Sequence, residues 1–224
     1  GLATATSASG PWQRQAAPIL QPRTGEWDAA ITSNPAAWIH RNGSVLLLYK
    51  SIRLGYPERN RAKPPFHLGA AFAPSIDGPF RRLFSSPILQ WAAGEKPLIN
   101  RGRPLAAEDP YVWRCGGRYH LIFKAMQPVR RSGLRSGDLA YTSSSDLRRW
   151  EPPVHAINRT LHWRSSAPAS QEPSHRFQTV ARLERPQLLL ADGQPTHVFC
   201  GMAPSRSGGI ARNVVLTLAR TASW

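Results

Sequence analysis

Apolar residues in this chain come in short runs that are separated by turn-forming residues. The longest run, Val45 to Tyr49, is too short for a segment that crosses a bilayer. The 21 prolines and 17 glycines are spread along the chain and interrupt it too often for long helices. This pattern predicts an all-β protein built from short strands joined by turns.

One repeated unit begins at an X-Pro pair and ends in a strongly apolar strand. Its prolines, Pro35, Pro110 and Pro186, are almost evenly spaced along the chain. In each unit an Asn-Gly, Gly-Gly or Asp-Gly pair precedes the apolar strand. These pairs favour two-residue hairpins because both central positions need positive φ. The spacing therefore predicts three equivalent β-hairpins, one for each X-Pro unit.

A second unit runs from an apolar strand through a turn to an aromatic residue, and an apolar run beginning with proline follows it. It covers residues 2–12, 68–80 and 139–150, whose starts are also nearly evenly spaced, and a fourth copy begins near Val214. The two units alternate in phase along the chain. Each period therefore holds four antiparallel strands.

Four antiparallel strands in each repeat are typical of a β-propeller blade. A β-sandwich also has many short strands, but it does not explain two motifs that recur in phase. Residues 1–224 are therefore expected to form a single, partial β-propeller domain of about three blades plus strands of a further one. The loops between the second and third strands are long, which is common for functional loops.

The charge of the chain is strongly basic, with 29 Lys and Arg against 13 Asp and Glu, and only four of the basic residues are lysines. The arginines are scattered rather than gathered in a run of five to eight, so nucleic-acid binding is not favoured. The basic balance suits an anionic glycan, and a surface that is simply rich in arginine, with no specific anionic partner, is the open alternative. The two cysteines and seven histidines show no metal-ligand spacing.

Candidate chemistry lies beside the three prolines. Asn34 precedes the first, Glu108 and Asp109 precede the second, and Glu184 and Arg185 precede the third. Equivalent strand starts converge around a propeller axis, so these side chains are expected to meet there. Paired carboxylates suit general acid–base chemistry on a glycosidic bond. The open alternative is structural: backbone capping by Glu108 and Asp109, and a plain ion pair between Glu184 and Arg185.

The X-Pro units, with the Ser-Asp-x-x-x-Trp ending at Trp150, resemble the five-bladed β-propeller glycoside hydrolases, which are the family 43-like proteins and the related families 32, 68, 117 and 130. The resemblance implies a carboxylate base in the first blade, a second carboxylate that tunes or positions, and a Glu that acts as general acid. Glu184 matches the acid best, and Asp109 matches the tuning carboxylate. Other residues are expected to bind substrate, namely Asn34, Glu108, Arg185, Trp27, Asp28, Lys124 and His175.

The chain also departs from that family. Five blades need far more than 224 residues, so the chain is expected to be a fragment whose base-carrying blade precedes Gly1, unless Asp28 takes that part. Asn34 stands where some relatives keep Asp, and an amide cannot act as a base. A non-catalytic propeller that binds a glycan or a protein is therefore the alternative function.

The resemblance carries further expectations about cofactor, partners and location. No cofactor is required, although a calcium ion in the central channel is possible in this family. The expected partner is a carbohydrate, for which a negative charge would suit the basic chain, with neither a membrane nor nucleic acid involved. The protein is expected to be a monomer, and to be secreted or periplasmic although the chain carries no signal peptide.

Overall fold

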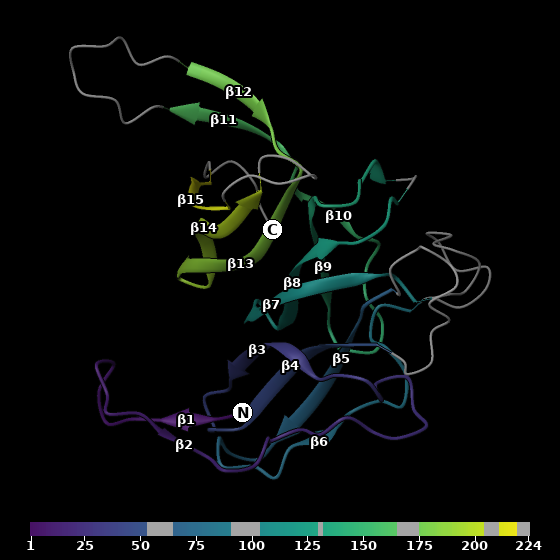
Figure 1. The fold of residues 1–224 in the computed structure, drawn as a ribbon, viewed down its shortest axis with the longest axis vertical. Helices are drawn as coiled ribbons and strands as arrows, with labels where there is room; N and C mark the ends of the chain where they lie inside the picture. Colours follow the sequence, from purple (N-terminus) through teal and green to yellow (C-terminus); the bar gives the residue numbers. More distant parts are fainter. Residues whose placement is uncertain (53–64, 91–103, 130–131, 165–174, 204–210, 219–224) are drawn as a thin grey trace.

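The computed structural model describes residues 1–52, 65–90, 104–129, 132–164, 175–203 and 211–218. Within these ranges the regular structure consists of β-strands, and each sheet is antiparallel (Figure 1). No helix among the described residues is long and apolar enough to span a membrane. The all-β prediction is confirmed.

Three sheets follow one another along the chain, and we name them blades A, B and C. Blade A contains β3 (Ser33–Ile39), β4 (Val45–Ser51), β5 (His67–Ala73) and β6 (Arg81–Arg82). Blade B contains β7 (Ala107–Cys115), β8 (Arg118–Ala125), β9 (Leu139–Ser144) and β10 (Val154–Ile157). Blade C contains β13 (Arg182–Ala191), β14 (Gln194–Ala203) and β15 (Arg212–Thr217). The first strand of each blade contacts the first strand of the next, as blades do around a propeller axis.

The strands β1 (Ala3–Thr4) and β2 (Gln13–Arg14) repeat the outer pair of blade A. Ala3 pairs with Arg14 just as Ala71, at the equivalent position of the next repeat, pairs with Arg82. The flanking backbone hydrogen bonds also recur at equivalent positions, for example from Gln15 to Leu2 and from Leu83 to Ala70, both over 2.9 Å. The second repeated unit of the sequence is thus the outer hairpin of a blade.

A further hairpin departs from the repeat. Strands β11 (Thr160–Arg164) and β12 (His175–Thr179) pair with each other between blades B and C. Figure 1 shows that this hairpin extends away from the three blades. These residues contain neither repeated unit, so the repeat predicted no hairpin here.

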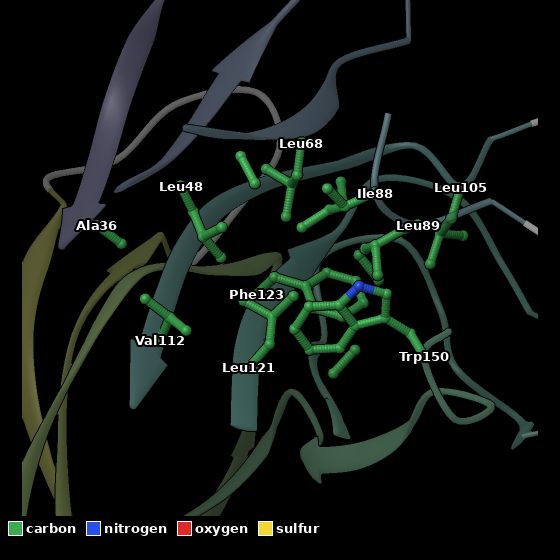
Figure 2. Close-up of a cluster of buried hydrophobic side chains, with 14 of the residues drawn as sticks. Ala36, Leu48, Leu68, Ile88, Leu89, Leu105, Val112, Leu121, Phe123 and Trp150 are labelled. Carbon is green, nitrogen blue, oxygen red and sulfur yellow. The ribbon is translucent and has the colours of Figure 1, made fainter. Parts of the chain in front are cut away.

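The core is divided among the gaps between successive sheets. One cluster lies between blades A and B and includes Leu48, Phe123 and Trp150 (Figure 2). A second lies between blades B and C and includes Trp113 and Leu183, and a third packs Leu20 against blade A. Blades A and B therefore bury both faces, which accounts for the apolar runs of β4 and β8. Blade C packs one face against blade B, and Leu189, Phe199 and Val215 of its strands are exposed.

Candidate functional site

The three X-Pro pairs share an unusual backbone conformation. Asn34, Asp109 and Arg185 have φ values of 48°, 55° and 52°, in the left-handed region. The strand register shifts at each pair, because proline has no N–H to donate and the ladder skips the two residues. Three equivalent β-bulges thus mark the starts of β3, β7 and β13.

The bulge of blade B is joined to the bulges on both sides through the Asp109 carboxylate. The Asn34 Nδ2 group donates to Asp109 Oδ1, and the Arg185 backbone N–H donates to Asp109 Oδ2 over 3.1 Å. Asp109 is buried, at 5% exposure. Burial raises the pKa of Asp109 above its usual value, and the neighbouring Glu108 carboxylate raises it further. Asp109 therefore links three blades at one point.

A second network of contacts lies beside the bulges and is centred on Lys124. Its buried ammonium group contacts Glu108 Oε1 and donates to Glu184 Oε1 over 2.7 Å. Lys50 contacts Glu108 Oε2 over 3.1 Å, and Arg182 Nε contacts Glu184 Oε1 over 3.0 Å. Carboxylates from blades B and C thus share one cation, as the expected convergence of strand starts requires.

These contacts shift the ionisation of the buried groups. Burial alone would raise the pKa of Glu108, but the ammonium groups of Lys124 and Lys50 outweigh it, and the pKa falls below its usual value. Burial would lower the pKa of Lys124, but its bonds to Glu108 and Glu184 outweigh burial and raise it. Both groups are therefore charged at neutral pH.

The carboxylates differ in their access to solvent. The Glu184 side chain is 32% exposed, whereas the Glu108 side chain is 11% exposed. Both cationic contacts of Glu184 fall on Oε1, and within the described part of the chain Oε2 has no hydrogen-bond partner. Glu184 is therefore the carboxylate that a substrate would reach most readily.

The ion pair between Glu184 and Arg185, which the structural alternative supposed, is not present among the described residues, and Arg182 pairs with Glu184 instead. Adjacent residues in a strand point to opposite faces, whereas residues two apart share a face. The spacing of Arg182 and Glu184 could have predicted this partner. Arg185 instead contributes its backbone N–H to the site.

Asp28 lies in a different set of contacts. Its side chain has no exposed surface, forms ion pairs with Arg23 and Arg82, and accepts a hydrogen bond of 2.9 Å from the Tyr49 hydroxyl. Burial acts against ionisation, but these partners lower the pKa of Asp28 below its usual value. A carboxylate enclosed in this way cannot contact a substrate, so the expectation that Asp28 replaces a missing base is not met.

Trp27 and His175 also lie apart from the bulge cluster. The Trp27 indole stacks on Tyr49, with 6.1 Å between ring centroids, and packs against the core cluster that contains Leu20. His175 belongs to β12 and pairs there with Arg164. Of the nine predicted site residues, six come together at the bulges: Asn34, Glu108, Asp109, Lys124, Glu184 and Arg185.

The donors at the bulges do not form a calcium site. Among the described residues, no group of three or more His, Cys, Asp or Glu side chains could hold a metal ion. The Glu108 carboxylate is bonded to two ammonium groups, which compete with a cation for its oxygens.

Comparison with known proteins identifies the fold. No family model matches the sequence, and a search of curated proteins found no match. An α-L-arabinofuranosidase from Lactobacillus brevis matches 87% of this chain with a TM-score of 0.54 and 11% identity, over 52% of its own length. A GH62 hydrolase in complex with xylotriose matches 91% with a TM-score of 0.51 and 12% identity, over 52% of its length. A further glycoside hydrolase matches 95% with a TM-score of 0.55 and 12% identity, over 55% of its length.

These similarities show that the chain has the fold of the β-propeller glycoside hydrolases. They confirm the predicted β-propeller of four-stranded antiparallel blades. The chain spans about half the length of the solved structures that it matches. At these identities the similarity concerns the fold, and the roles of individual residues rest on the geometry of the site.

Proposed function

We propose that the protein cleaves glycosidic bonds in an oligo- or polysaccharide, at the end of the inner strands where the three bulges meet. The observation that carries this proposal is the shared ammonium group of Lys124, which holds Glu108 of blade B and Glu184 of blade C at one point. Convergent carboxylates with different environments suit the separate roles that glycoside hydrolysis needs. The similarity of the fold to solved glycoside hydrolases supports the substrate class.

Glu184 is the candidate proton donor to the leaving-group oxygen. It is the most exposed of the three carboxylates, and its Oε2 is not engaged by Lys124 or Arg182. These two cations fix the other oxygen and so hold the carboxyl group in one orientation. In each cycle Glu184 would take up a proton from solvent and donate it from Oε2 to the leaving-group oxygen as the glycosidic bond breaks. Water would add to the anomeric carbon and release a proton to solvent, which balances the reaction.

Asp109 is a positioning residue in this scheme. Both of its oxygens accept hydrogen bonds from neighbouring bulges, and it is buried. It sets the relative position of the strand starts that carry Asn34 and Arg185. Residue 34 stands at the bulge position where some relatives keep an Asp. In this chain it is an amide, which cannot act as the base that activates water.

The second candidate function is glycan binding without cleavage. Asn34 favours this function. It stands at the bulge of blade A, equivalent to Asp109 in blade B, and its amide donates to Asp109 and cannot act as a base. A propeller without a base at these positions would keep the polar side chains of the bulge cluster and lose the reaction. The two candidates predict the same ligand class and differ in turnover.

The decisive experiment compares Glu184→Gln with Glu151→Gln in the intact protein. Glu151 is 64% exposed and pairs with Arg118, away from the bulges, so it is a matched control for charge. A panel of arabinosides, xylosides and galactosides is assayed as aryl glycosides and as natural oligosaccharides. If Glu184 is the acid, Glu184→Gln lowers kcat on natural oligosaccharides by about 100-fold or more.

Aryl glycosides separate the acid role from a structural role. A dinitrophenyl leaving group departs without a proton, so its cleavage should be much less sensitive to Glu184→Gln. An equal loss on both substrate types would contradict the proton-donor assignment. A wild-type protein that binds an oligosaccharide and never cleaves it would support the second candidate.

A further inference from the structure

An open cavity lies at the other end of the inner strands from the bulges. The hairpin turns of the three blades, after β3, β7 and β13, border this cavity, whose volume is about 1120 Å³. The bulges stand at the starts of the same strands, so the length of a strand separates the cavity from Glu184. This cavity is therefore distinct from the proposed catalytic site.

The cavity carries more positive than negative charge. Arg41 and Arg114 line it from blades A and B, and both are exposed. Asp192, from the turn of blade C, is the carboxylate among its lining residues in the described part of the chain. Two guanidinium groups on one concave surface favour an anion, because each can donate two parallel hydrogen bonds to a carboxylate or sulfate.

One wall of the cavity is aromatic and held in place by contacts that are already formed. The Arg114 guanidinium lies over the Tyr119 ring, 5.5 Å from its centroid. The His40 ring meets Tyr119 edge-on, with 5.9 Å between centroids. Trp38 and Phe72 extend this wall within blade A. Arg114 is thus oriented by stacking and needs little reordering to bind a ligand.

We propose that this cavity binds an anionic sugar residue, a pyranose that carries a carboxylate or a sulfate. The guanidinium groups of Arg41 and Arg114 take the anion, and the aromatic wall takes the apolar face of the sugar ring. The choice of a saccharide rests on the proposed function, whereas the choice of an anion rests on the cavity itself. The site would hold a charged glycan at a distance from the point of cleavage.

Isothermal titration of the intact protein with trigalacturonate tests the proposal, and the fully methyl-esterified trisaccharide is the matched neutral ligand. Trigalacturonate should bind, and the ester should bind at least tenfold more weakly. Arg114→Gln and Arg41→Gln should each weaken binding of trigalacturonate about tenfold or more. A sulfated carrageenan tetrasaccharide, titrated in the same way, distinguishes a sulfate site from a carboxylate site.

The control is Arg148→Gln, which removes the same charge from an exposed arginine that lies over Phe84, outside the cavity. Arg148→Gln should leave the affinity unchanged. The readout here is binding and not turnover, so failure of this proposal and failure of the proposed hydrolysis give different results. Equal affinity for the ester and the acid would overturn the proposal. So would binding that is insensitive to Arg114 and Arg41, or tighter binding of AMP than of trigalacturonate through these two arginines.

Discussion

The Lys124 ammonium of blade B donates to Glu184 of blade C over 2.7 Å and also contacts Glu108 of its own blade. One buried cation therefore serves two carboxylates that stand a full repeat apart in the sequence. This arrangement couples the stability of two blades to the geometry of the proposed proton donor.

Lys124→Met should destabilise the protein strongly. The substitution keeps the apolar stem of the side chain and removes the charge. Glu184 then has Arg182 as its remaining cationic partner, and Glu108 has Lys50. Breaking a buried ion pair from one side costs about 3–5 kcal/mol, and we expect the free energy of unfolding to fall by about 3 kcal/mol. Urea unfolding of the intact protein measures this loss.

Lys50→Met is the matched control for that variant. Lys50 contacts Glu108 but not Glu184, and Glu108 keeps Lys124 in its absence. The expected loss is about 1.5 kcal/mol, the lower range for a hydrogen bond to a charged group. Equal losses in the two variants would show that the added contact of Lys124 with Glu184, between blades B and C, contributes nothing to stability.

The stabilising effect of Glu108 should depend on pH. Its pKa in the folded protein lies below the ordinary 4.5, so the folded state favours the ionised form. The resulting stability is fully present above the unfolded pKa and is lost as the pH falls through the lower folded pKa. The difference in free energy of unfolding between wild type and Glu108→Gln should therefore shrink below pH 4.5. A difference that grew on acidification would contradict this sign.

The repeat in the sequence was sufficient to predict the blades and the meeting of Asn34, Asp109 and Glu184. The spacing of the repeated units and their turn residues can be read directly from the sequence. In a propeller, equivalent positions of successive repeats lie around one axis, so the spacing also predicts which residues are close in space. The left-handed conformation of Asp109 was not predictable in this way, since proline restricts the preceding residue mainly to extended backbone.

Partners set by long-range packing also escaped prediction. The sequence around Asp28 gives no sign that Arg82, far along the chain in the next repeat, encloses it together with Tyr49. The hairpin β11–β12 breaks the repeat, so the repeat carried no information about it. Sequence periodicity therefore located the bulges and left the burial of individual carboxylates undetermined.

Asn34→Asp tests the contact between the first two bulges. The Asn34 amide donates to Asp109 Oδ1, and the substitution puts a second carboxylate against that oxygen. Two adjacent carboxylates share a proton, so the pKa of the pair rises. At pH 7 the free energy of unfolding should fall by about 2 kcal/mol, and part of it should return on acidification. Urea titrations at several pH values measure both effects.

Asn34→Ala provides the comparison, because it removes the hydrogen bond without adding charge. Its loss of stability should not be regained at low pH. The same two variants address the second candidate function. If cleavage of an oligosaccharide appears in Asn34→Asp and not in the wild type, residue 34 occupies the base position and the natural chain is a binding protein.

Arg185→Gly should stabilise the protein, although it removes a large side chain. Arg185 has a φ of 52°, and a Cβ in this region costs about 1–2 kcal/mol. Glycine removes that strain, while the greater freedom of the unfolded chain offsets about 0.5–1 kcal/mol of the gain. The contact with Asp109 survives, because the backbone N–H makes it. The expected net increase in the free energy of unfolding is about 0.5–1 kcal/mol.

Arg185→Ala separates strain from the loss of the arginine side chain. Alanine keeps the Cβ and its strain. The free energy of unfolding of Arg185→Ala should therefore be lower than that of Arg185→Gly by about 0.5–1 kcal/mol. The Arg185 side chain is exposed, and both variants remove it equally. Differential scanning calorimetry of the two variants measures the difference directly. If the alanine variant were the more stable of the two, the left-handed bulge would not be a strained feature of this site, and its conformation would have to be stabilised by the hydrogen bond to Asp109 alone.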